Sequence, residues 1–439
     1  MPRAIFLYVE STPGELASGT NLPDTSTILA GTHYALRPDR SPTDMGPGRT
    51  ITPASADRGR SGRGASQGVR RGDYYTSGGT RYPKAGGVFS VEMEVCQPGS
   101  GVAWSTTPAW HILRSRYALD TPAIATDTVT GVSGLRLTPA TPASWDTGDV
   151  AVVTINGHDY AFMVTGRTGD DLLIHPGLPS TLAGGTTVRL CHRLYPRPGS
   201  EGSTFAIIDH GPSTLWIGTH CRLGDHSFTR SGDGRLILRA DLLVGTWVPS
   251  HSNADAWTAL GASPVGGPAR LDDIQWRVSS DYQGDGGSLL TSASHSSAAI
   301  TGLTVESLEV AVAVNSETVA GIHLPTGVCS IKTGDVNATM TIGACDYSAT
   351  FNYDSLRAGV RAQMLCCGPL GAGAGVVLGG AGWMLDPASL PDAVEPTLTR
   401  DKQMLTFLST GDASPCDEAP GVGGYADANP ASWFIGLVQ

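Results

Sequence analysis

The stretch Arg222–Val244, with the sequence RLGDHSFTRSGDGRLILRADLLV, decides the fold. Two strand-like halves flank the turn Ser231–Gly234, whose two glycines supply the positive φ angles that a tight hairpin needs. The second half alternates with the period of a half-buried strand. Its apolar set is Leu236, Leu238, Ala240 and Leu242, and its opposite set is Arg235, Ile237, Arg239 and Asp241. The sequence therefore predicts a long β-hairpin with one face on a core and one polar, wet face.

The overall composition also favours β structure. The 439 residues include 57 glycines and 29 prolines, and charged residues make up only 16% of the chain. This density of turn-forming residues, with abundant Thr, Val and Ala, favours many short strands, and the length allows roughly two to four domains. The low charge content indicates that part of the surface is buried against other copies. We expect a mainly β protein that assembles with itself.

The sequence gives no sign of export or of membrane insertion. The apolar run Ala4–Val9 is too short for the core of a signal peptide. The richest apolar stretch, Gly371–Gly382, is short and full of glycine, unlike a membrane span. A net charge of −11 argues against anionic membranes and general nucleic-acid binding as partners. We therefore expect a protein made in the cytoplasm, with no membrane partner.

Cysteine spacing and short motifs predict no metal site, cofactor or enzyme activity. The eight cysteines are irregularly spaced, without a C-x-x-C pair, which favours free and mostly buried thiols. Cys191–His192 with His210 and His220–Cys221 is the best alternative metal set, but adjacent side chains on a strand point to opposite faces. Neither a G-x-S-x-G elbow, nor a phosphate loop, nor an HExxH motif occurs.

Residues 1–86 are predicted to form an extended arm. Between positions 58 and 71, five arginines alternate with Gly and Ser. We favour a flexible or extended arm that becomes ordered when it contacts an acidic neighbouring subunit. The alternatives are an RNA-binding arginine–glycine tract and a cell-adhesion tripeptide at Arg71–Asp73. The candidate arm residues are Arg58, Arg60, Arg63, Arg70 and Arg71.

A first β-domain is predicted from two segments, 87–127 and 197–249. In the first segment, Val88–Val95 alternates in polarity and places Glu92 and Glu94 outward. Thr107 and Pro108 then supply an N-cap and a first-turn proline for a short helix that shows an apolar face up to Tyr117.

An inserted module at 128–196 interrupts this domain. Its clearest element is a hairpin with its turn at Asn156–Gly157, and five short strands predict a small β-barrel whose two ends lie close together. A polar linker, 250–269, leads to a second β-rich domain, 270–439. Within it, Val336–Asn352 is the best candidate for a second long hairpin.

The chain resembles the major tail tube proteins of long, non-contractile-tailed (siphovirus-like) bacteriophages, in the form with two tail tube domains in one polypeptide. The hairpin at Arg222–Val244 is similar to the lumen-lining hairpin of that family. Further regions extend the resemblance over the whole chain. They are Glu15–Thr20 with Leu36–Asp39, the module segments Gly148–Val150, Asn156–Gly157 and Leu172–Ile174, and the closing strands Met404–Leu408 and Trp433–Val438.

This resemblance implies a non-enzymatic subunit whose rings stack into a hollow tube that conducts viral DNA. Because rings of this family contain six tail tube domains, a two-domain chain implies homotrimeric rings with pseudo-sixfold symmetry. The implied partners are the chain itself, the tail tip, tail terminator and tape-measure proteins, and viral DNA in transit. The implied location is the virion tail, assembled in the host cytoplasm. Arg235, Arg239 and Asp241 are the lumen-facing candidates.

The expected fold is thus mainly β: tandem tail-tube-type β-sandwich or barrel domains, each with a short helix, plus the inserted small β-barrel and the N-terminal arm. Two other classes stay open. One is another virion component, such as a tail-tip or capsid decoration protein, and the other is a secreted β-rich adhesin or enzyme.

Overall fold

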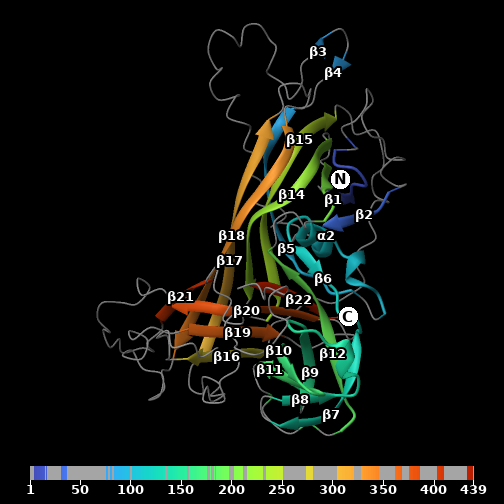
Figure 1. Cartoon of the computed structure of the whole chain (residues 1–439). Helices are drawn as coiled ribbons and strands as arrows, with labels where there is room; N and C mark the ends of the chain where they lie inside the picture. The colour runs from blue at the N-terminus through green and yellow to red at the C-terminus, as the bar shows by residue number, and fades with distance from the viewer. Residues whose placement is uncertain are drawn as a thin grey trace.

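The protein is mainly β, as a computed structural model shows (Figure 1). The structure describes the following residues: 4–14, 16, 31–36, 76–77, 80–81, 84–98, 101–133, 136–155, 158–175, 178, 182, 184–196, 202–210, 215–230, 234–250, 273–279, 304–320, 328–345, 361–367, 375–385, 403–409 and 433–438. The arm arginines at positions 58–71 and the linker from residue 251 lie outside these residues.

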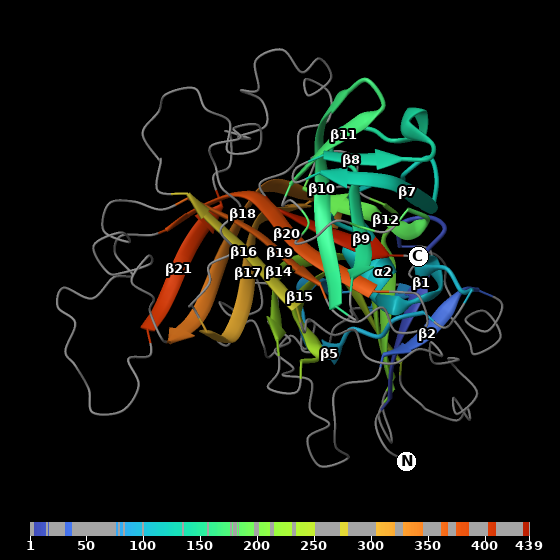
Figure 2. The same ribbon diagram turned by 90° about the horizontal axis from the view of Figure 1, so that it is seen from below.

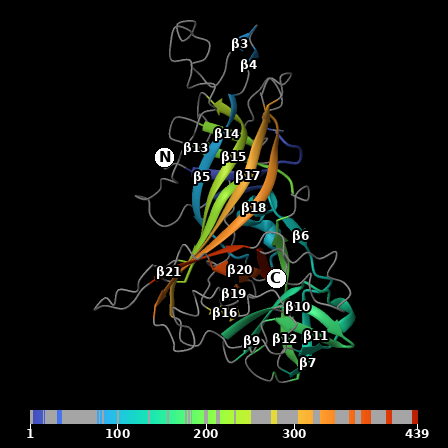
Figure 3. The same ribbon diagram turned by 60° about the vertical axis from the view of Figure 1, so that its left-hand side comes forward.

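A long antiparallel sheet forms the spine of the molecule (Figures 1 and 3). Its strand order is β5–β15–β14–β17–β18, so the strands of the two halves of the chain lie side by side. The bounds are β5 Lys84–Glu94, β14 Leu215–Arg230, β15 Leu236–Ser250, β17 Thr304–Ala320 and β18 Val328–Cys345.

The hairpin predicted at Arg222–Val244 is confirmed. Arg230 pairs with Leu236, and Gly234 next to the turn has a φ of 85°. Leu236, Leu238, Ala240 and Leu242 are all buried on the core side. Ile237 differs from the expectation, because it lies on the outward face yet is also buried.

A β-bulge interrupts β14 in the middle of this sheet. Leu223 pairs with Leu242 and His226 with Ala240, so Gly224 and Asp225 together oppose Asp241. A Cβ atom at Gly224 would lie 2.8 Å from the carbonyl oxygen of Asp241, which explains why glycine stands there. The bulge turns Asp225 to the exposed side while His226 is buried.

The second long hairpin is β17–β18, which corrects the expectation for Val336–Asn352. Thr304 pairs with Cys345 and Ala320 with Val328, so the two strands are consecutive in the chain and Val336 falls inside β18. The error arose because each strand is long and contains register shifts, which hid the true turn from a short sequence window.

The inner face of the long sheet packs on a layer that holds a short helix, α2 (Pro108–Arg114). Thr107 caps the helix, accepting a bond from the Trp110 backbone N–H at 3.3 Å, with Pro108 in the first turn as predicted. A 3-10 turn, η4 (Trp104–Thr106), precedes it. The helix ends at Arg114, before Tyr117, which is nevertheless fully buried in the same core.

The N-terminal segment departs from the predicted arm. Strand β1 (Ala4–Val9) pairs with β13 (Phe205–His210) and with β2 (His33–Leu36), and it belongs to the body of the molecule. Ile5 and Leu7 enter the main core, since the strand is apolar on both of its faces. A separate two-stranded hairpin, β3 (Thr76–Ser77) with β4 (Thr80–Arg81), lies above the spine in Figure 1.

The C-terminal strands cross below the spine and join it to the rest of the body (Figures 1 and 3). They are β16 Asp273–Ser279, β19 Arg361–Cys367, β20 Gly375–Leu385, β21 Gln403–Ser409 and β22 Phe434–Val438. One buried core contains residues from Ile5 to Leu437, so the two predicted tail tube domains share one core and one sheet.

Six strands of the inserted module close into a small barrel (Figure 2). The closed order is β7–β8–β11–β10–β9–β12 and back to β7, one strand more than the sequence suggested. The bounds are β7 Thr126–Ser133, β8 Arg136–Pro139, β9 Val150–Ile155, β10 His158–Thr168, β11 Asp171–His175 and β12 Thr186–Tyr195. Its interior is filled by apolar side chains around Trp145 and Phe162.

The barrel is joined firmly to the body through its last strand. Strand β12 pairs with barrel strands up to Leu190 and then, from Cys191, with β22 and with β6 (Ala118–Asp120) of the body. The outer faces of β9 and β10 also form a buried apolar cluster with Val377, Phe434 and Val438.

A buried arginine also connects the barrel to the body. Arg193, 3% exposed, lies 2.7 Å from the Asp120 carboxylate, donates to the Gly148 carbonyl at 2.8 Å and stacks over the Tyr195 ring. On the barrel side, burial raises the pKa of Asp149 to about 6, although the backbone N–H of Asp146 bonds to its carboxylate.

Among the described residues, no helix is both long enough and apolar enough to cross a membrane.

Candidate functional site

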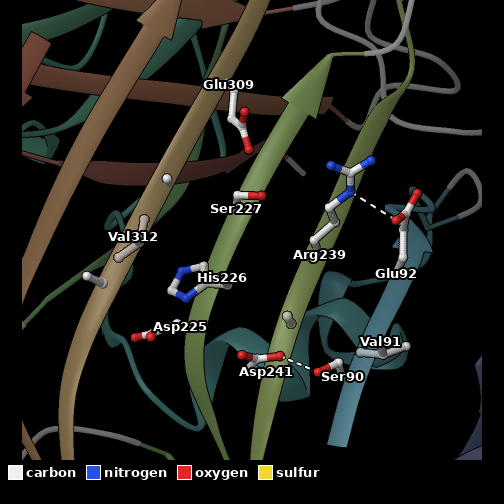
Figure 4. Close-up of a pocket in the computed structure, with 13 residues that line it drawn as sticks. Ser90, Val91, Glu92, Asp225, His226, Ser227, Arg239, Asp241, Glu309 and Val312 are labelled. Atoms are coloured by element: carbon white, nitrogen blue, oxygen red, sulfur yellow. Dashed lines mark hydrogen bonds and ion pairs between the residues drawn. The ribbon is translucent and has the colours of Figure 1, made fainter. Parts of the chain in front are cut away.

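A shallow groove of about 460 Å³ runs along the outward face of the long sheet (Figure 4). Residues from β5, β14, β15 and β17 line it, so both long hairpins contribute. The lining is mostly polar or small, in contrast to the apolar residues that the same strands send into the core. The groove is therefore a wet surface backed by a rigid sheet.

Three polar pairs connect β5 with β15 and with Arg235 just before it, and two of these pairs lie in the groove. Arg239 Nε lies 2.9 Å from the Glu92 carboxylate, and Arg235 lies 3.3 Å from that of Glu94. Ser90 Oγ donates to the Asp241 carboxylate at 2.5 Å. Figure 4 shows the Arg239 and Asp241 pairs bridging the two strands side by side.

Asp225 and Glu309 add negative charge on the side of β14 and β17. The Asp225 carboxylate accepts the Val314 backbone N–H at 2.7 Å, just beyond the last β14–β17 register pair, His226 with Val312. The bulge thus allows an exposed acidic side chain to extend the β14–β17 pairing. On β17, Glu309 is followed along the groove by two small residues, Ala311 and Ala313.

This face is net acidic. Of the side chains described in the groove and in the Arg235–Glu94 pair next to it, two guanidiniums, those of Arg235 and Arg239, stand against five carboxylates. The carboxylates are those of Glu92, Glu94, Asp225, Asp241 and Glu309. Such a surface repels polyanions and shows no broad basic patch on which a phosphate backbone could settle.

His226 reaches the edge of the groove but is held in the core. Its Nδ1 donates to the Gly224 carbonyl at 2.8 Å and its Nε2 lies 2.7 Å from the Tyr117 hydroxyl. Burial lowers its pKa to about 4, so the ring is neutral at pH 7. The neighbouring Ser227 side chain points to the opposite face of the strand. These two groove residues therefore do not form a nucleophile and base pair.

The structure places Arg235, Arg239 and Asp241 together on the outward face of the hairpin, where the alternation put them. Sequence reasoning placed Glu92 and Glu94 outward but missed their arginine partners, and it missed Ser90, Asp225 and Glu309 in this role. A signal existed in β5, whose polar residues at 90, 92 and 94 match the spacing of the charges in β15. The pairing of the two strands, about 150 positions apart, carried no local signal.

Two buried cysteines behave as structural thiols. Cys191 and Cys221 are buried and free, and burial raises the pKa of both thiols, which makes them unreactive. Cys96 is also free and partly exposed. Within the described ranges, no group of three or more His, Cys, Asp or Glu side chains is arranged to hold a metal ion.

No protein-family profile matches the chain, and no curated protein matches its sequence.

Proposed function

We propose that the chain is a tail tube subunit of a long-tailed bacteriophage, a structural virion protein that stacks in rings around a DNA-conducting channel. The observation that carries the proposal is the pair of long hairpins, β14–β15 and β17–β18, side by side in one sheet. Both hairpins bury their inner face, and their outer faces share a polar, net acidic groove. An acidic wall lets DNA slide past because it does not bind phosphate.

The sheet has the edges that such an assembly requires. Among the described strands, β5 pairs only with β15, and residues 328–338 of β18 pair only with β17. Edges of this length favour pairing with another chain, and closing a ring of subunits removes them. In the proposed tube, β5 of one subunit lies beside β18 of the next.

Each chain contributes two long hairpins, and a ring of the proposed family contains six tail tube domains. Three chains would therefore complete a ring. The adjacent β14–β17 pair within one subunit would reproduce the contact that separate tail tube domains make in a ring. The proposed partners are further copies of the chain and the tail tip, terminator and tape-measure proteins, with assembly in the host cytoplasm and a final place in the virion tail.

Electron microscopy of the purified full-length chain tests the proposal. We expect long hollow tubes with three chains in each ring. Rings of six chains would contradict the two-hairpin count but leave a tube. Isolated particles under all assembly conditions would contradict the proposal and favour a tail-tip or decoration protein.

A further inference from the structure

Every second residue at the end of β5 engages a polar side chain of β15. Glu92 stands directly opposite Arg239 in the register and bonds to it, and Ser90 stands opposite Asp241 and bonds to it. Glu94, opposite Ile237, reaches diagonally to Arg235. Strand β5 therefore engages both guanidiniums of the groove face.

Stability does not explain the ion pair of Arg239 and Glu92, which is the more exposed of the two. The Arg239 and Glu92 side chains are 55% and 46% exposed, and exposed pairs of this kind contribute about 0–1 kcal/mol. The inner side of the same strands already supplies a full apolar core. The Arg239–Glu92 pair is thus placed where it changes the chemistry of the surface more than the stability of the fold.

Arginine is the side chain best suited to hold a phosphate. Its planar guanidinium donates two parallel bonds to phosphate oxygens, and most contacts between proteins and DNA are made to the backbone. An arginine that already donates to a carboxylate offers fewer donors, and the carboxylate repels an approaching phosphate. Glu92 bonds to Arg239 and Glu94 bonds to Arg235. Each glutamate therefore occupies donors of its arginine and also repels an approaching phosphate.

We infer that Glu92 and Glu94 form an anti-retention ladder, which keeps Arg235 and Arg239 from binding the phosphates of duplex DNA. This inference rests on the proposed function, because it explains how a channel wall that contains arginines avoids retaining its cargo. The ladder acts locally, at the two guanidiniums. It differs from a general repulsion by the net charge of the chain.

The test compares two double variants with the same change of net charge. Glu92→Gln with Glu94→Gln releases the arginines, while Asp225→Asn with Glu309→Gln removes two groove carboxylates that bond to neither arginine. An asparagine at 225 keeps an oxygen to accept the Val314 N–H. The probe is a labelled duplex of mixed sequence, titrated with the unassembled full-length chain at a low salt concentration of about 50 mM.

We expect the Glu92/Glu94 variant to bind the duplex at least about tenfold more tightly than the parent chain, with a salt slope steeper by up to about 2. The Asp225/Glu309 variant should stay close to the parent. Adding Arg235→Gln and Arg239→Gln to the first variant should abolish the gain. Equal binding by both double variants, or no gain in the first, would overturn the inference.

Folding and assembly are measured separately. Circular dichroism and thermal unfolding confirm that each variant is native, and the single variant Glu92→Gln, which frees Arg239 alone, replaces the double variant if Glu94→Gln does not fold. Absence of tubes in micrographs of the parent would contradict the proposed function without altering the binding comparison. Tubes together with unchanged DNA binding would contradict the ladder alone.

Discussion

The Tyr117 hydroxyl donates to Nε2 of His226 across 2.7 Å, in the buried layer beneath the long sheet. The indole N–H of Trp433 donates to the same hydroxyl oxygen at 3.2 Å. Because the Gly224 carbonyl can only accept, Nδ1 carries the single proton of a neutral ring. A second proton on Nε2 would face the tyrosine and leave the phenol hydrogen without its acceptor. The fold is therefore built around an uncharged His226.

Acidification should destabilise the protein through this histidine. The folded state binds the proton only near pH 4, whereas the ordinary pKa is 6.5, so stability is full above pH 6.5 and falls as the pH drops toward 4. The difference between the two pKa values corresponds to about 3 kcal/mol. Urea denaturation at several pH values should show this loss for the parent and a flatter curve for His226→Gln. Parallel curves would contradict the assignment.

Asp149 should have the opposite dependence. Its folded pKa of about 6 exceeds the ordinary 3.8, so the buried charge costs stability above pH 6 and this cost disappears as the pH falls toward 3.8. Asp149→Asn should gain about 2 kcal/mol at pH 8 and nothing at pH 4. Its amide oxygen can still accept the Asp146 N–H. The check is a denaturation series on both chains, and equal stability at pH 8 would refute this prediction.

The two faces of the hairpin should respond differently to substitution. Leu238 is fully buried, so Leu238→Asp places an unpaired carboxylate in the core and should cost about 4 kcal/mol or more, enough to prevent folding or assembly. Asp241→Asn should change the free energy of unfolding by less than about 1 kcal/mol, since an amide oxygen can still accept from Ser90. Soluble yield and denaturant midpoints measure both. A strongly destabilised Asp241→Asn would show that the carboxylate charge is required.

Removal of the barrel should damage the body. Deletion of 128–196 takes away Cys191–Leu194, the partners of β22, and uncovers Val377, Phe434 and Val438. A shorter deletion, 127–188, keeps those partners and joins Thr126 to Arg189, which are already paired. We expect the longer deletion to be insoluble and the shorter one to fold with reduced stability. Equal stability of both deletion proteins and the parent would mean that the barrel is an independent appendage.

Local patterns predicted much of this structure. The alternation at Leu236–Leu242 gave the correct buried face, and Thr107–Pro108 gave the correct start of the helix. These features depend on neighbours within a few residues, which a sequence displays directly. The mainly β class followed from the same kind of information.

Long-range pairings were beyond such patterns. The ion pair of Glu92 and Arg239 depends on β5 lying beside β15, and the shared role of β12 depends on β22, more than 200 positions away. The apolar run Ala4–Val9 was judged only as a signal sequence, although its burial on both faces marks an interior strand. In each case the missing information was the identity of the partner strand.

The register of β14 against β17 also has a kinetic consequence. Strand β14 ends at Arg230, and its neighbour β17 begins only at Thr304. At typical translation rates the ribosome needs roughly 4–15 s to make the intervening segment. During that interval the emerging hairpin exposes Ser227 and its neighbours as an unsatisfied edge that a second nascent chain could capture. Slow, non-local closure of this kind makes production of the subunit sensitive to chaperones and to expression rate.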